Sequence, residues 1–221
     1  MTSKLIKGRR VTDAETLKVV TMVYAGLINK NITATLQQEN CNAIGLTGAD
    51  GNFIRAKRRP VVTVYSEEKG TDIHVDYGFV GDLDDTSVDS EALNKLLESG
   101  FTPVFSAITH NGKGQLLNTN ADTIASVLAV SMARLYETSL IYCFEKAGVL
   151  MDVDDERSLI RSIDLPYYNE LKQQGIINEG MIPKLDNAFE AIKQGLKEVC
   201  IGKSDSLSLL NEHNFGTRLT K

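Results

Sequence analysis

A helical pattern between two apolar runs constrains the fold of this chain most. The runs cover residues 102–108 and 139–144, and residues from about 120 to 136 have helical apolar periodicity. Two parallel strands need a crossover of this kind, so the pattern predicts a βαβ unit. The last third repeats the alternation, with expected helices near 155–162, 167–174 and 182–197 and strands at 199–201 and 217–219. The predicted class is α/β, a three-layer αβα sandwich with a mainly parallel central sheet.

The first half predicts one long helix followed by a small antiparallel region. The helix runs from Asp13, which caps it, to about residue 38. A strand is expected at 41–47, hairpin strands at 61–65 and 73–80, and a helix at 90–98. We expect one compact unit with two lobes, residues 1–110 and 111–221.

Composition excludes several classes of protein. The chain has 221 residues, a net charge of −5, 6% aromatic residues and no Trp, so neither a basic field nor a stacking platform for nucleic acid is expected. No apolar stretch approaches the roughly 20 residues that span a bilayer. The three cysteines are widely spaced and are expected to be reduced core thiols of a cytoplasmic protein. We expect no membrane association.

Lys184 lies where a helix is expected to begin, after Gly180 and Pro183. The positive end of a helix attracts anions and disfavours a cation, so a lysine there is typical of a phosphate site. The alternative is a lysine that points into solvent.

Polar side chains also gather before the expected helix at 120–136. Asn120 and Asp122 are explained as a cap and a dipole partner, but Asn118 is not. Near the N-terminus Arg9 and Arg10 precede the first helix, where a guanidinium can bind a carboxylate or serve solubility. The acids between residues 82 and 91 form a solvated loop or, less often, a cation site.

Eight strings match a known family in order along nearly the whole chain. They are 8–13, 29–30, 45–51, 80–82, 118–122, 148–150, 180–184 and 216–219. In these strings the chain resembles the acetylglutamate kinases of the amino acid kinase family. The resemblance implies transfer of phosphate from ATP with Mg²⁺ to the γ-carboxylate of an N-acyl-L-glutamate in arginine biosynthesis.

The resemblance also implies residue roles. It assigns substrate binding to Arg10 and Asn118, and catalysis to Lys184 and Asp122, the latter by organising the catalytic lysines. It places the nucleotide along Glu145, Lys146, Ala147, Gly148, Val149, Leu150, Ile176, Ile177 and Asn178. Residues 1–110 would bind the acyl amino acid and residues 111–221 the nucleotide. A homodimer through the long helix after Asp13 is the implied assembly.

The chain departs from the family pattern in two places. The family's first strand with a lysine and paired glycines, and its His-Gly-Gly-Gly loop, are not in this sequence, so we expect little or no turnover from these residues alone. Residues Cys143 to Gly148 stand where the family usually has Thr/Ser-Asp-Val-x-Gly. This variant is similar to a branch that uses a succinyl group. Arg9, Lys57, Arg58 and Arg59 are the candidates for binding its extra carboxylate.

The sequence leaves three alternative functions open. Carbamate, aspartate and uridylate kinases belong to the same superfamily, but Arg10 and the 118–122 string favour acylglutamate. A chain of this fold can also be a non-catalytic nucleotide-binding remnant or a subunit that stabilises a partner. A cation-binding scaffold on residues 82–91 is the third.

Overall fold

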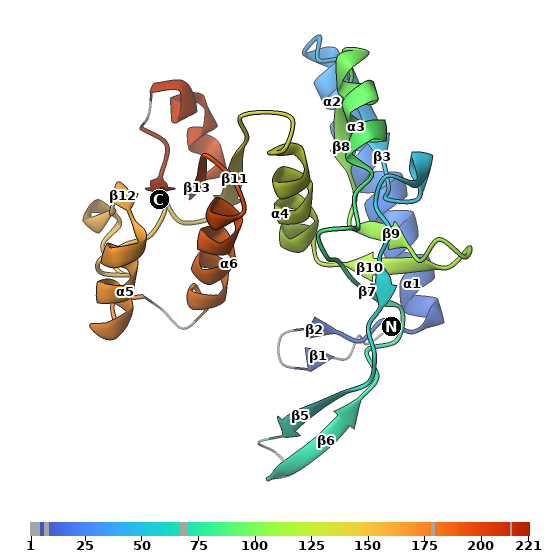
Figure 1. Ribbon diagram of the computed structural model, residues 1–221, viewed down its shortest axis with the longest axis horizontal. Helices are drawn as coiled ribbons and strands as arrows, with labels where there is room; N and C mark the ends of the chain where they lie inside the picture. Colours follow the sequence, from blue (N-terminus) through green and yellow to red (C-terminus); the bar gives the residue numbers. More distant parts are fainter. Residues whose placement is uncertain (1–4, 7–8, 67–69, 178–179, 213) are drawn as a thin grey trace. The chain divides into compact units, whose positions relative to one another are not determined.

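The computed structural model describes residues 5–6, 9–66, 70–177, 180–212 and 214–221 (Figure 1). The chain divides into two compact units, residues 1–127 and 128–221, and the boundary falls inside one helix. Helices and strands alternate in both units, and the predicted α/β class is confirmed.

The described part of the first unit contains small sheets and four helical stretches. Its strands are β1 (Leu5–Ile6), β2 (Arg9–Arg10), β3 (Ala43–Leu46), β4 (Lys57–Arg58), β5 (Val62–Ser66), β6 (Thr71–Val75), β7 (Val80–Asp82), β8 (Thr102–Phe105), β9 (Ile108–His110) and β10 (Leu116–Thr119). Its helices are α1 (Ala14–Val20), η1 (Thr21–Ile28), α2 (Asn29–Gln38), η2 (Asp50–Asn52), α3 (Ser90–Glu98) and the start of α4 (Ala121–Met132).

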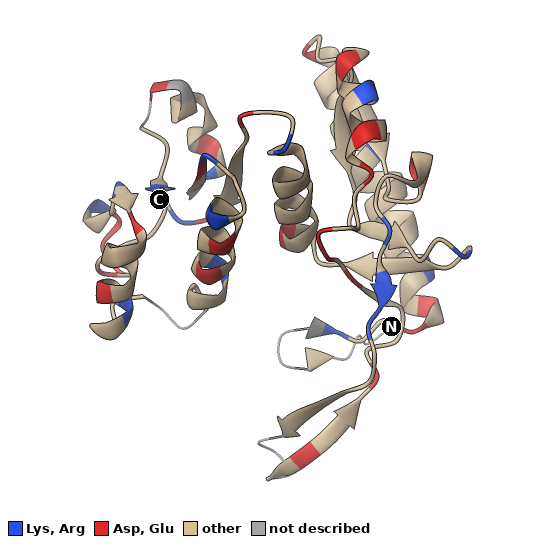
Figure 2. Cartoon of the chain, in the orientation of Figure 1, with Lys and Arg blue, Asp and Glu red and all other residues tan. Residues whose placement is uncertain are grey.

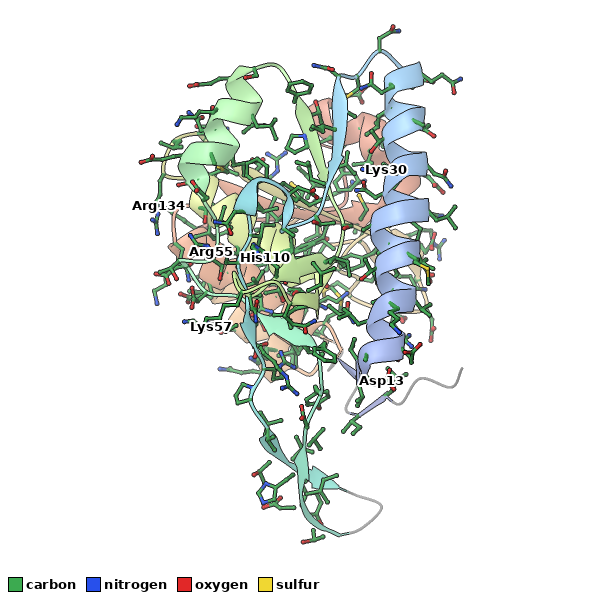
Figure 3. The ribbon with its side chains drawn as sticks, turned by 90° about the vertical axis from the view of Figure 1, so that its right-hand side faces the viewer. Asp13, Lys30, Arg55, Lys57, His110 and Arg134 are labelled. Atoms are coloured by element: carbon green, nitrogen blue, oxygen red, sulfur yellow. The ribbon has the colours of Figure 1, made fainter. Side chains whose placement is uncertain are left out.

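The long N-terminal helix is confirmed from Ala14 to Gln38 as α1, η1 and α2 in succession. Asp13 caps it by accepting a 2.7 Å hydrogen bond from the backbone of Thr16, and lies at the helix start in Figure 3. The middle segment η1 is a π-helix, which the periodicity did not predict. Leu17 and Val20 pack against Ile108 and anchor the helix on the strands.

The central strand of the first unit is β10. The sheet order is β4-β7-β10-β9, with β10 parallel to β7 and antiparallel to β9. β3 and β8 form a separate parallel pair. The antiparallel hairpin β5–β6 is confirmed, and Figure 1 shows it projecting from the rest of this unit.

The second unit is built on one four-stranded sheet. Its elements after α4 are β11 (Ser139–Phe144), η3 (Glu156–Ser158), β12 (Ser162–Ile163), α5 (Leu165–Gln173), α6 (Ile182–Lys193), β13 (Glu198–Lys203), η4 (Ser204–Glu212) and β14 (Thr217–Leu219). The order is β11-β13-β14-β12, and β11 is parallel to β13 over six residue pairs. Val199, Ile201 and Leu219 on the sheet and Leu185 and Ile192 on α6 are all buried, so they make the core.

Two expectations about local structure are wrong. The apolar run 102–108 is two strands, because β8 pairs with β3 whereas β9 pairs with β10. Within the second unit the parallel partner of β11 is β13. Residues 155–162 hold a short 3₁₀ turn and a strand instead of a helix. Asp155 accepts from the backbone N–H of Arg157, and this local bond closes a turn.

The cysteines differ from one another in exposure. All three are free thiols, but only Cys200 is buried, whereas Cys41 is half-buried and Cys143 is exposed. The expectation of three core thiols is therefore wrong for Cys143. None of the helices within the described residues combines the length and apolar character needed to cross a membrane.

Candidate active site

Asn118 is held at the end of β10 by the segment that precedes the long helix. Its side-chain amide donates a 3.1 Å hydrogen bond to Oγ1 of Thr12, which is fully buried. The backbone of Thr12 bonds to Tyr77 and Phe79 on the neighbouring chain segment. Arg10 lies two residues before Thr12 and is exposed. The structure thus brings the segment that carries Arg10 beside Asn118.

The start of α4 confirms the structural explanation of Asn120. Its side-chain oxygen accepts a 2.9 Å hydrogen bond from the backbone N–H of Thr123, so Asn120 caps the helix. Asp122 lies in the first helical turn and is half-buried. Residues 112–115 form the turn between β9 and β10.

The basic residues around β4 are each paired with an acid. Arg58 contacts Asp76 at 3.1 Å, and Lys57 contacts Asp84 at 2.7 Å. Arg59 makes a two-bonded contact with Asp82 and lies over the ring of Tyr77. Figure 2 shows these cations of β4 in blue. Of the four candidates for a second substrate carboxylate, three are therefore neutralised, and the side chain of Arg9 lies outside the described residues.

Three of the acids between residues 82 and 91 bond to other groups of the fold: Asp82, Asp84 and Asp89. Asp84 accepts from Lys57 first and then from Thr86, and these hydrogen bonds hold the pKa of its carboxyl well below the usual range. Asp89 caps α3 through Ala92. The described residues contain no group of three or more His, Cys, Asp or Glu side chains arranged for a metal ion.

In the second unit Lys184 lies in the first turn of α6, as predicted. Pro183 stands beside it, and the N-cap residue Met181 makes no side-chain cap. The ammonium does not point into solvent, because Nζ lies 3.9 Å from the centre of the Phe144 ring. Phe144 ends β11, so strand and helix converge on this point.

The predicted nucleotide residues follow β11 and differ in exposure. Glu145 and Lys146 are exposed, Ala147 and Gly148 are half-buried, and Val149 and Leu150 are buried. Gly148 has a φ of +154°, and a Cβ there would lie 2.6 Å from Oγ1 of Thr217. That hydroxyl accepts from the backbone of Val149 at 2.8 Å. The backbone of this loop is therefore held close to β14.

The second predicted nucleotide segment follows α5. The backbone of Ile176 donates to Leu171 at 3.1 Å, and Ile177 is buried. Asn178 lies outside the described residues. Leu150, Val149 and Ile177 have buried side chains, so they offer backbone groups and not side chains to a ligand.

Sequence reasoning missed three residues that support these sites: Thr12, Phe144 and Thr217. All three lie in segments named in the sequence analysis but carried no assigned chemistry, and threonine or phenylalanine in a strand is ordinary. Only the contacts with Asn118, Lys184 and Val149 distinguish them.

Each unit by itself offers groups that attract an anion. The first has a guanidinium and an oriented amide, which bind carboxylates. The second has a lysine in the first turn of a helix, where the positive end of the helix dipole also favours an anion.

Comparison with known proteins gives consistent matches. Residues 2–203 match the Amino acid kinase family. A protein named acetylglutamate kinase from Cytophaga hutchinsonii is 51% identical over 219 residues, which cover 98% of this chain and 78% of that protein. One of the same name from Bacteroides thetaiotaomicron is 49% identical, with 99% and 79% covered. A crystal structure of smu.665 from Streptococcus mutans is 25% identical with a TM-score of 0.72, covering 100% of this chain and 78% of that one.

Proposed function

Because the chain belongs to the amino acid kinase family, we propose that it transfers a phosphoryl group from ATP to the γ-carboxylate of N-acetyl-L-glutamate. The observation that carries this proposal is the 51% identity, over nearly the whole chain, to a protein named acetylglutamate kinase. The product is an acyl phosphate, and the reaction belongs to arginine biosynthesis. A cytoplasmic location accompanies the proposal, since the reaction uses ATP.

In the proposed reaction, substrate binding falls to Arg10 and Asn118. The guanidinium of Arg10 offers two parallel N–H donors to the α-carboxylate. Asn118 already gives one amide hydrogen to Thr12, which fixes the plane of the amide and leaves a second hydrogen for a substrate oxygen. Substrate orientation of this kind lowers the entropic part of the barrier.

Lys184 is assigned to the phosphates. Transfer between two anions needs little covalent help from the protein, but it needs charge neutralisation along the reaction path. The ammonium in the first turn of α6 supplies a positive charge at the positive end of the helix dipole, which also favours anions. Mg²⁺ is proposed to enter with ATP, since phosphate oxygens are the ligands it prefers. Asp122 is proposed to organise the catalytic lysines, and the backbone of 145–150 and 176–178 to hold the nucleotide.

The acyl group is proposed to be acetyl, with succinyl as the second candidate. A succinyl group brings another carboxylate and needs another cation. Lys57, Arg58 and Arg59 already bind acids of the same unit, which favours the smaller acyl group.

Acyl-phosphate formation tests the proposal directly. The purified chain is incubated with ATP, Mg²⁺ and either N-acetylglutamate or N-succinylglutamate, and the product is trapped with hydroxylamine. Lys184→Met should lower kcat by about 100-fold or more. Lys193→Met is the matched control, because Lys193 lies on the same helix and pairs with Glu190 at 3.8 Å. Equal losses in the two variants would contradict the assignment.

The rate of this polypeptide is a separate question. We propose that residues 1–221 assayed alone turn over slowly, because the two glycine motifs implied by the resemblance are not among them. The alternative of a non-catalytic nucleotide-binding protein is supported if ATP raises the melting temperature while neither acylglutamate is phosphorylated.

We also propose a homodimer through the long helix. Val19, Met22, Leu27 and Ile32 are exposed along α1, η1 and α2, with 64% of the Met22 side chain and 61% of Leu27 accessible. Exposed apolar groups of this kind mark protein interfaces. Met22→Glu should convert a dimer to a monomer in light scattering, whereas Val153→Glu, at an exposed position in the second unit, should not.

A further inference from the structure

Four lysines of the second unit contact a carboxylate: Lys172, Lys193, Lys197 and Lys203. Lys184 differs, because its ammonium lies over the face of Phe144 at 3.9 Å from the ring centre. A cation within about 6 Å of a ring centre is attracted by the negative face of the aromatic quadrupole. Within the described residues no carboxylate pairs with Lys184.

We infer that Phe144 is a positioning residue, whose ring holds the ammonium of Lys184 at the start of α6 ready to meet the phosphates of ATP. The inference rests on the proposed function, in which Lys184 neutralises phosphate charge. The resemblance described in the sequence analysis places Thr or Ser at this position in most of the family. The aromatic ring therefore belongs to the variant sequence that this chain has at residues 143–148.

The location of Lys184 explains why it needs such a partner. A cation in the first turn of a helix is repelled by the positive end of the helix dipole. A flexible lysine side chain in that position would turn away into solvent, and its ammonium would then no longer point toward the phosphates. Phe144 ends β11 and is itself half-buried beside Tyr142, with ring centres 6.1 Å apart, so the ring has a fixed place.

A ring also suits phosphate chemistry better than an acid would. A carboxylate partner would neutralise the ammonium and repel the incoming phosphates. The neutral ring attracts the ammonium from one side only and leaves N–H donors of Lys184 free on the other. The lysine is therefore positioned without losing its charge.

The geometry is tested without any activity. Lysines are labelled with ¹³C at Cε, and the Lys184 signal is identified by its loss in Lys184→Arg. A ring 3.9 Å away should move the Cε proton signals of Lys184 upfield by its ring current. The shift should persist in Phe144→Tyr and disappear in Phe144→Leu. An ordinary Lys184 signal in the unmodified chain would overturn the inference.

The function is tested by affinity for ATP with Mg²⁺, measured by calorimetry. Phe144→Leu should raise Kd about three- to tenfold, and Phe144→Tyr should restore it. Replacement of Phe144 by 3,4,5-trifluorophenylalanine keeps the ring's packing but weakens its negative face, so an intermediate Kd is expected. This variant separates the effect of the ring's charge distribution from a loss of folding.

Two further variants complete the test. In a Lys184→Met background, Phe144→Leu should have no additional effect on Kd, because the ring acts through that lysine. Tyr167→Leu removes another half-buried ring of this unit and should leave Kd unchanged. ATP affinity that is indifferent to the ring overturns this inference alone. No ATP binding by the unmodified chain would overturn both this inference and the proposed function.

Discussion

The amide of Asn118 donates to the hydroxyl of Thr12 across 3.1 Å, and this bond joins positions 106 residues apart in the chain. Thr12 is fully buried, and its hydroxyl also contacts the carbonyl of Arg10 at 3.5 Å. One hydroxyl thus connects both residues that we assign to the substrate's α-carboxylate. The site in the first unit depends on a residue that does not itself bind substrate.

Thr12→Val should therefore damage both stability and substrate binding. Valine has nearly the same shape, but it cannot accept from Asn118, and the half-buried amide would lose its partner at a cost of about 1 kcal/mol. We expect lower stability in urea and a raised KM for N-acetylglutamate with a smaller effect on that for ATP. Thr35→Val is the control, since the Thr35 hydroxyl bonds to Asn31 on an exposed helix face. Similar KM values in the two variants would contradict the role of Thr12.

Gly148→Ala should destabilise the second unit. The added methyl would lie 2.6 Å from Oγ1 and 2.9 Å from the backbone N of Thr217, and the φ of +154° is unfavourable for alanine. Overpacking and backbone strain together should cost about 2–4 kcal/mol. Gly175→Ala has a positive φ but open space around it, so it should cost less. Thermal melting of both variants checks the order, and an equal loss would mean that Thr217 can move aside.

The ion pair of Asp84 predicts a dependence of stability on pH. Hydrogen bonds from Lys57 and Thr86 lower the pKa of Asp84 in the folded protein, compared with about 3.9 in an unfolded chain. The stabilisation is therefore present above about pH 4 and is lost as the pH falls further. The carboxylate is 37% exposed, so the effect is small.

Urea unfolding of the unmodified chain and Asp84→Asn measures this effect. The difference in unfolding free energy should be constant from pH 7 to about pH 5 and shrink below about pH 4. Lys57→Met should give the same trend, because it removes the main partner. A difference that grows on acidification would refute the role of the ionised carboxylate.

The three thiols should react with a disulfide reagent at different rates. Burial raises the pKa of the Cys200 thiol, and neighbouring Glu198 adds to this effect, so Cys200 should react only after unfolding. Cys143 is exposed and should react first in the folded protein, with Cys41 slower. Mass spectrometry after timed labelling identifies each site. Early labelling of Cys200 would mean that β13 opens readily.

Structural features that depend on residues close together in the sequence were predictable. Asp13 caps its helix as predicted, through a contact with the residue three positions along the chain. The strand at 139–144 has the predicted bounds, since its continuous apolar run is typical of a buried strand. The short helix at 155–162 was wrong because the Asp155 turn competes with helical hydrogen bonding.

The sequence by itself determined the α/β class and the family, and it identified Lys184, Asn118 and Arg10 as candidate site residues. Periodicity, capping and motif order are properties of the linear chain, so no tertiary structure was needed for this. Tertiary structure alone decided which strands pair, so that the run 102–108 divides between two sheets. It also decided that Thr12 orients Asn118 and that Phe144 receives Lys184. Such contacts join residues far apart in the chain, and their energies depend on distance and burial, which only the packed fold sets.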